Sequence, residues 1–309
     1  MNHFLCQLGK RRYFLQKLFW NVLKKGKKQK FPFGMSLIPV YRFKTLFLSS
    51  LFLTLIFSAD AQNDLKSWNA AQLDLSLTKK LDLRFGHLRG YNISNGFSSD
   101  FNQSSIHLDY DLTKRFSMSA GAILGSLSAA DGANRFVLRG TYKTPIADVL
   151  NWSNSIQGEV HSSNETRYRY RLIYITRLAT KKRLDFLRLS PSVSYSLFYN
   201  IGGNPIQYYD KNEIPAVRQT PDGFHRGRLS FNLNSRVTKN LSLSVYYMMQ
   251  REFNLFTDDY HKINVFNPVT GKIVRRFQDY NVIGITLSFD FKLYKKKKKP
   301  TKKAEYLNN

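Results

Sequence analysis

The stretch that decides the fold runs from Arg167 to Leu178 and reads RYRYRLIYITRL. With the period of two that a β-strand imposes, its residues divide into a face rich in arginine and a face that is aromatic and aliphatic. On an α-helix, with its step of about 100° per residue, the same residues form neither an apolar stripe nor a basic stripe. The stretch is therefore predicted to be a strand whose two faces meet different surroundings.

Similar alternation recurs through the chain after Gln62, and no helix is indicated there. Short turns at one end of the strands and long loops at the other are the layout of a transmembrane β-barrel. The alternating segments lie at 73–77, 81–85, 106–112, 193–199, 229–233, 241–249 and 283–293. Short turns beginning with threonine lie at 78–80, 113–115, 180–182 and 238–240. Longer polar connections lie at 91–100, 126–134, 200–225 and 253–279.

The fold class predicted is all-β, a single antiparallel transmembrane β-barrel of about 10 to 12 strands. Strands long enough to cross a bilayer at a tilt favour a membrane barrel over a soluble sandwich, whose strands are mostly about 5 to 6 residues long. The hairpin count is eleven, an odd number that places the first strand on the loop side. Residues 261–278 are a candidate for a missing hairpin arm, and a mature N-terminus threading the lumen is the alternative.

The N-terminal part predicts a route to the bacterial outer membrane. Basic residues, an apolar run at 46–57 and the small residues Ala59 and Ala61 indicate a signal peptide at 35–61, cleaved before Gln62. Residues 1–34 carry nine basic residues and no acidic ones, and are interpreted as a mis-called start, with a basic amphipathic helix as the alternative. The barrel is predicted at 62–294, followed by a lysine-rich disordered tail at 295–309.

The net charge of +27 does not indicate a nucleic-acid partner, because much of it lies in the N-terminal block and the tail. The single cysteine, Cys6, precedes the barrel, so the barrel has no internal disulfide or cysteine metal site. The scattered histidines lack metal-ligand spacing, and no cofactor is expected. The expected partner is outer-membrane lipid, with a small solute or a lipid as candidate ligand.

Four segments of the alternating region are GEVHSSNETRYRYRLIYITRL, LRLSPSVSYSLFYN, HRGRLSFNLNSRVTKNLSLSVYYMMQ and YNVIGITLSFDFK. Together they resemble the domain-of-unknown-function 2490 family of outer-membrane barrels. The resemblance covers about Trp68 to Lys292 and implies an outer-membrane barrel with no assigned chemistry. Where family members often have an acid-x-Arg pair, this chain has Glu159-Val160-His161.

In such a barrel the arginine face of the opening stretch is expected to line the lumen, and Tyr168, Tyr170, Leu172 and Tyr174 to face lipid. A charge on the lipid face costs about 2 to 4 kcal/mol at the midplane, so the two faces cannot be exchanged. The inward arginines are expected to form a ladder of hydrogen bonds with carboxylates, including that of Asp109. The predicted lumen-facing polar residues are Arg167, Arg169, Arg171, Arg177, Glu159, Asp82, Arg84, Arg228 and Asp290.

Three functions fit this pattern, and a structural or porin-like transport barrel without catalytic chemistry is favoured. The segment HSSN resembles the His-x-Ser-Asn motif of outer-membrane phospholipases and lipid A deacylases, and would make His161 and Ser163 a base and nucleophile on the lipid-facing wall. Glu165 stands where the phospholipase pattern has glycine. A surface-recognition barrel is the third function, acting through long loops with exposed aromatics at Tyr208, Tyr209, Phe224 and Tyr260.

Overall fold

The computed structural model describes residues 64–94, 96–127, 134–146, 148–162, 167–273 and 275–294. The predicted N-terminal extension, the signal peptide with its cleavage site and the lysine-rich tail fall outside these ranges. Within them, no helix is long and apolar enough to span a bilayer.

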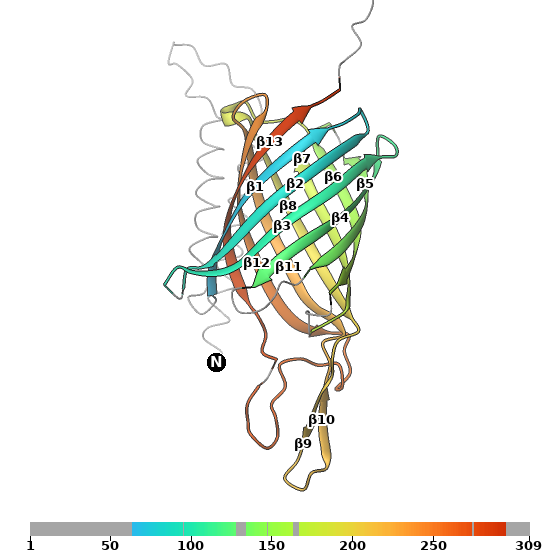
Figure 1. The fold of residues 1–309 in the computed structure, drawn as a ribbon, viewed down its shortest axis with the longest axis vertical. Coiled ribbons are helices and arrows are strands. Elements are labelled where there is room, and N and C mark those ends of the chain that lie inside the picture. Colours follow the sequence, from blue (N-terminus) through green and yellow to red (C-terminus); the bar gives the residue numbers. More distant parts are fainter. Residues whose placement is uncertain are drawn as a thin grey trace, which may run out of the picture. The chain divides into compact units, whose positions relative to one another are not determined.

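Eleven strands of the described residues form one closed barrel, in which each strand pairs with the next barrel strand along the chain and the last pairs with the first (Figure 1). β9 and β10 form a separate hairpin inserted between β8 and β11. The barrel strands are β1 (Asp64–Ser76), β2 (Leu81–Asn92), β3 (Ser98–Asp111), β4 (Phe116–Leu127), β5 (Arg135–Ile146), β6 (Leu150–His161), β7 (Tyr170–Thr180), β8 (Leu189–Ile201), β11 (Gly223–Arg236), β12 (Leu241–Leu255) and β13 (Tyr280–Lys292). The remaining elements are the 3-10 turn η1 (Phe186–Arg188), β9 (Ile206–Tyr209) and β10 (Pro215–Gln219).

The barrel closes through a parallel pair, β1 with β13, in register from Asp64 opposite Tyr280 to Ser76 opposite Lys292. A meander with an odd number of strands begins and ends in the same direction, so its closing pair must be parallel. The predicted fold class and the count of eleven are thus confirmed. Residues 261–278 do not supply a further barrel strand, because their described part contains only the isolated bridge between Phe266 and Ile273.

Apolar side chains cover the outer wall, and contacts between distant strands identify the inner one. On the outer wall, Phe136 is 71% exposed and Ile156 is 66% exposed. Inside, the Arg228 guanidinium of β11 lies 5.6 Å from the ring of Trp68 on β1, although β12 and β13 separate these strands. A closed sheet with an apolar exterior is the β-structure that hydrocarbon tolerates, and the protein is an outer-membrane β-barrel.

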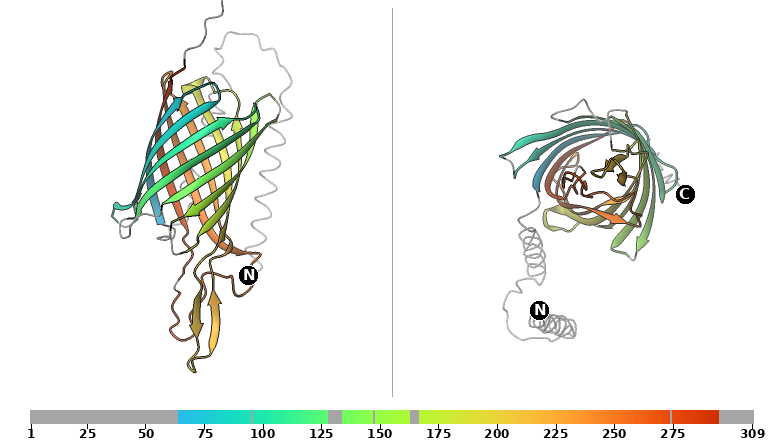
Figure 2. Two further views of the ribbon diagram at one scale, coloured as in Figure 1. Left: turned by 45° about the vertical axis from the view of Figure 1, so that its right-hand side comes forward. Right: turned by 90° about the horizontal axis from the view of Figure 1, so that it is seen from below.

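Beyond one end of the barrel, the β9–β10 hairpin and the connection between β12 and β13 extend together (Figures 1 and 2). The Arg275 guanidinium joins them by donating to the carbonyls of Asn204 and Gln219. Asn254 holds the start of the connection, since its side chain exchanges hydrogen bonds of 2.9 Å with the backbone of Ile263. We call this end of the barrel the loop end and the opposite end the turn end.

Candidate functional site

A cluster of buried charges lies inside the barrel at the loop end of β6. The Glu159 carboxylate is 3.5 Å from Nη1 of Arg171, 3.7 Å from Nε of Arg135 and 3.1 Å from Nε2 of His161. Its side chain is only 4% exposed. A carboxylate at this depth remains ionised only if nearby charges and donors replace its hydration, and these three neighbours do so.

Strand register explains why these residues meet. Glu159 is paired with Arg171 across β6 and β7, and His161 is paired with Arg135 across β5 and β6. Because side chains alternate along a strand, Glu159 and His161 lie on the same face of β6. The cluster is therefore two cross-strand pairs stacked along one wall.

A second group of charges lies on β11 and β12. Arg226 pairs with Glu252, its Nε lying 2.8 Å from Oε1 of the carboxylate. Arg228, two residues further along, instead donates to the Gln250 amide oxygen at 2.8 Å and to the Tyr280 hydroxyl at 3.2 Å. Its guanidinium carbon lies 5.0 Å from the Phe198 ring centroid, a cation–π contact.

Together these groups make one layer, which we call the charged layer, across the loop end of the lumen. It holds four guanidinium groups and two carboxylates and therefore carries an excess of positive charge. Among the buried nitrogens of the layer, Nη2 of Arg171 and Nε1 of Trp68 have no hydrogen-bond partner among the described residues. Its members are Trp68, Arg135, Glu159, His161, Arg171, Arg226, Arg228, Gln250, Glu252 and Tyr280.

Nearer the turn end the lumen is more open. Arg84 lies 2.7 Å from Asp74 and 3.2 Å from Asp109, and its side chain is 34% exposed. Arg177 is also exposed and donates to the Ser192 hydroxyl at 3.1 Å. Access to the interior therefore decreases from the turn end toward the charged layer.

The predicted lumen residues do not form one continuous ladder. Arg171 and Glu159 meet in the charged layer, whereas Asp82 is paired in register with Asp109 on β3. Asp290 is opposite Asp74 at the β1–β13 seam. Pairing was thus anticipated for part of the set, but the strands distribute it into two separate clusters.

The first residues of the opening stretch are placed differently from the expectation. β7 begins at Tyr170, so the alternation that holds from there does not extend back to residue 167. Arg167 is exposed and donates to Gln278 in the β12–β13 connection, while Arg169 lies over the Tyr170 ring. Tyr168 was expected to face lipid, but it is 7% exposed and packs on Arg171 inside the barrel.

Sequence reasoning missed several members of the charged layer. Arg226 and Glu252 follow the continuous register of the β11–β12 hairpin, which shifts only beyond them near Phe224. Counting outward from the turn at 238–240 could therefore have found this pair. Arg135 was overlooked because it begins β5 directly after a polar connection. His161 could have been placed inside, since it is two residues from Glu159 on a strand.

The structure does not support a lipid-facing pair of His161 and Ser163. The His161 side chain is 2% exposed, faces Glu159 and packs edge-on against Tyr168 at 4.9 Å. A lipid ester would need access from the outer wall. Ser163 belongs to a segment that is not described.

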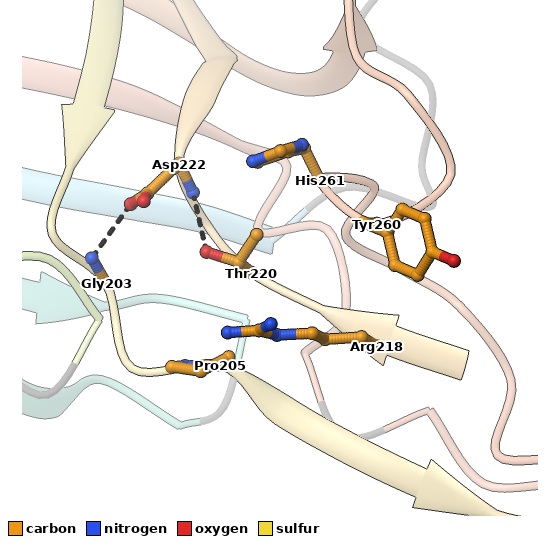
Figure 3. A pocket seen from close by; sticks show the side chains of 7 residues that line it. All are labelled: Gly203, Pro205, Arg218, Thr220, Asp222, Tyr260 and His261. Atoms are coloured by element: carbon orange, nitrogen blue, oxygen red, sulfur yellow. Dashed lines mark hydrogen bonds between the residues drawn. The ribbon is translucent and has the colours of Figure 1, made fainter. Parts of the chain in front are cut away.

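The loop end also carries a pocket of about 410 Å³ between the base of the β9–β10 hairpin and the β12–β13 connection (Figure 3). Asp222 accepts a hydrogen bond from the Gly203 amide at 2.8 Å, which fixes one wall. The Tyr260 carbonyl accepts from the Thr220 amide at 3.2 Å and fixes the other. The Arg218 guanidinium lies along the pocket and has no carboxylate partner among the described residues (Figure 3).

Of the four loop aromatics considered for recognition, two are accessible. Tyr260 is 64% exposed and Tyr209 is 49% exposed. Tyr208 is buried and donates to Gln219, and Phe224 packs on Tyr199 at 4.7 Å. Within the described ranges, no group of three or more His, Cys, Asp or Glu residues could hold a metal ion.

Comparison with known proteins gives one family and a set of distant barrels. The family whose model matches residues 65–261 is described as "Protein of unknown function (DUF2490)". No curated protein matches the chain. The NanC porin is 9% identical, with 74% of this chain and 100% of that chain covered and a TM-score of 0.41. The KdgM porin is 14% identical, with 58% and 81% covered and a TM-score of 0.35, and OprD from Pseudomonas aeruginosa is 16% identical, with 58% and 48% covered and a TM-score of 0.28.

Proposed function

The chain belongs to the DUF2490 family, and from the geometry of its lumen we propose that it is a narrow outer-membrane channel that prefers small anions. The observation that carries the proposal is the charge of the charged layer. Four guanidinium groups and two carboxylates are gathered across one level of the lumen. Rings of cationic side chains favour anions in pores, because a low-dielectric wall strengthens their field.

The exposed fraction of the interior charged side chains falls from the turn end to the charged layer, which supports a passage with one constriction. Interior charges toward the turn end are partly exposed, as for Arg84 at 34%, whereas Glu159 and Glu252 in the charged layer are 4% and 5% exposed. A solute entering from the turn end would keep its water until it reached this layer. There the free donors of Arg171 and Trp68 could replace part of that water.

The test is the reversal potential of the refolded protein in planar bilayers under a potassium chloride gradient. The proposal expects discrete conductance with anion preference, and expects Arg228→Gln to lower the anion-to-cation permeability ratio by about twofold or more. Arg228 suits this test because it donates to an amide and a hydroxyl, so its removal deprives no carboxylate of its counter-charge.

Arg115→Gln is the matched control, because it removes one positive charge from the exposed turn before β4, at the turn end of the barrel. It should leave the permeability ratio unchanged. A gel showing heat-modifiable mobility would establish that each variant folds. A folded but electrically silent barrel, or one that prefers cations, would overturn the proposal.

The pocket at the loop end favours a second candidate function, recognition of a small anionic solute outside the membrane. Its support is that the Arg218 guanidinium and the exposed residue Tyr260 both line this pocket (Figure 3). Calorimetry with glucuronate, with glucose as the neutral counterpart, tests it. Binding of glucuronate alone that is lost in Arg218→Gln would support this function, and equal or absent binding would oppose it.

A further inference from the structure

Across β1, β2 and β3, the outer wall of the barrel carries polar as well as apolar side chains. Toward the turn end the outward residues there are apolar, as at Phe85 and Ile106, which are 38% and 45% exposed. Toward the loop end the same outward faces become polar. The exposed polar residues, which we call the polar patch, are Asn69, His87, Arg89, Asn102 and Ser104.

Strand register gathers the polar patch into two adjacent rows. Asn69, Arg89 and Asn102 are directly opposite one another across the three strands. In the next row His87 is opposite Ser104, and its Nδ1 lies 3.0 Å from the Ser104 hydroxyl. Two rows in register make one surface rather than a scatter of polar positions.

The basic member of the patch lacks a counter-charge. The Arg89 guanidinium lies over the Tyr91 ring at 5.3 Å, and no carboxylate pairs with it in the described part of the chain. In contact with hydrocarbon such a group is costly, whereas an anionic headgroup at the membrane surface satisfies it. A second copy meeting the patch through a two-fold axis would bring like charges together, which opposes that occupant.

An apolar hollow of about 710 Å³ lies on the outer wall across β4 to β8, next to the strands of the polar patch. Small residues make it, since Ala120 and Ala122 face outward beside the larger Phe136 and Leu172. Ala122 is opposite Ile106, two residues from Ser104 of the patch. An exposed polar patch with one cationic side chain and an apolar hollow thus lie on neighbouring strands, as an amphiphile with a headgroup and acyl chains requires.

We propose that this outer wall is a binding site for a phosphorylated lipid of the loop-end leaflet. The polar patch receives the headgroup phosphate, with Arg89 as the charged donor and Asn69 and Asn102 beside it. The hollow receives an acyl chain. The site lies outside the barrel and does not depend on conduction through the lumen.

Native mass spectrometry of the folded protein tests the site, with phosphatidic acid as the probe and diacylglycerol of the same acyl chains as its phosphate-free counterpart. The wild-type barrel should retain phosphatidic acid in preference to diacylglycerol. Arg89→Gln should weaken that retention about tenfold, the effect of losing one charge-assisted hydrogen bond. Ala122→Phe should weaken it too, by filling the hollow.

Arg115→Gln, which removes a charge distant from the patch, should retain phosphatidic acid like the wild type. Inorganic phosphate in excess should not displace the lipid, and displacement would mean a simple anion site. Equal retention of the two lipids, or unchanged retention in both Arg89→Gln and Ala122→Phe, would overturn the proposal. A dimer that replaces the lipid adducts and disappears in Arg89→Gln would assign the patch to a second copy.

Discussion

At Glu159, one carboxylate faces two guanidinium groups and an imidazole in a wall that water scarcely reaches. Such a cluster stabilises the fold only while all of its charged partners are present. Each ion is costly to bury alone, and the attraction between them offsets that cost only while every partner is present. Single substitutions therefore have large effects here and small effects at exposed pairs.

Glu159→Gln should lower the free energy of unfolding by about 3 to 5 kcal/mol, because Arg171 keeps a buried charge without its carboxylate. Urea unfolding in lipid vesicles, followed by circular dichroism, measures the change. Asp290→Asn, a partly exposed carboxylate at the seam, is the control and should have little effect. A loss below about 1 kcal/mol in Glu159→Gln would place the cluster among exposed, weak ion pairs.

Asp258 in the β12–β13 connection offers a pH-dependent prediction outside the membrane. A hydrogen bond from the His261 ring lowers the pKa of the Asp258 carboxyl, helped by the His261 backbone amide. A depressed pKa contributes stability above the carboxyl's ordinary pKa, and that stability is lost as pH falls through the folded value. The loop should therefore loosen only at acidic pH.

Carbon NMR of the Asp258 carboxyl checks this directly. Its titration midpoint should lie below that of an ordinary aspartate and should move upward in His261→Gln. Lys262→Gln is the control, since Lys262 pairs with Asp259 and should leave the midpoint of Asp258 unchanged. Identical midpoints in the wild type and His261→Gln would contradict the assigned cause.

Three of the hairpin turns are held by the same arrangement of hydrogen bonds. In each, a threonine hydroxyl accepts hydrogen bonds from the amides two and three residues later, as Thr113 does from Arg115 at 3.2 Å and Phe116 at 2.9 Å. Thr78 and Thr238 do the same in their own turns. Thr180 differs, because its hydroxyl meets Ser190 and a longer connection with η1 follows.

Thr113→Val should lower the free energy of unfolding by about 0.5 to 1.5 kcal/mol, the usual contribution of a hydrogen bond, because two turn amides lose their acceptor. The shift in urea midpoint measures it. Thr113→Ser keeps the hydroxyl and should stay near the wild type. Equal losses in both variants would mean that the methyl group, rather than the hydroxyl, stabilises the turn.

The whole molecule depends on its seam, where the first and last strands meet. Gly284 of β13 lies in register between Trp68 of β1 and Tyr246 of β12. A Cβ at Gly284 would fall 1.9 Å from Cζ of Tyr246, so the tyrosine ring occupies the space that a side chain would need. Closure thus relies on a residue without a side chain beneath an aromatic ring.

Gly284→Ala should lower the free energy of unfolding by about 1 to 3 kcal/mol, because the added methyl group displaces the Tyr246 ring. The urea midpoint of the refolded barrel reports the loss. Gly140→Ala is the matched control, since its Cβ would meet only Phe116 at 3.6 Å, an ordinary contact. A Gly284→Ala barrel as stable as Gly140→Ala would show that the ring moves without cost.

Local pattern was sufficient for the barrel itself. The alternation of Leu172 and Tyr174 against Arg171 and Ile173 appears in the sequence because lipid and lumen impose a period of two on every spanning strand. Threonine turns and long loops then defined the hairpins and their count of eleven. These features need only neighbouring residues, so they can be recognised before any long-range contact is known.

Only the tertiary structure decided which charges meet and where the strands end. The β11–β12 register shifts beyond Arg226, near Phe224, and Tyr168 enters the barrel because β7 starts two residues later. The cation–π contact between Arg228 and Trp68 forms only because the barrel closes by pairing β1 with β13. Register, strand ends and closure are set by the free energy of the whole sheet, so local sequence alone does not determine them. A slip of one residue would move every side chain of a strand to the opposite face of the sheet.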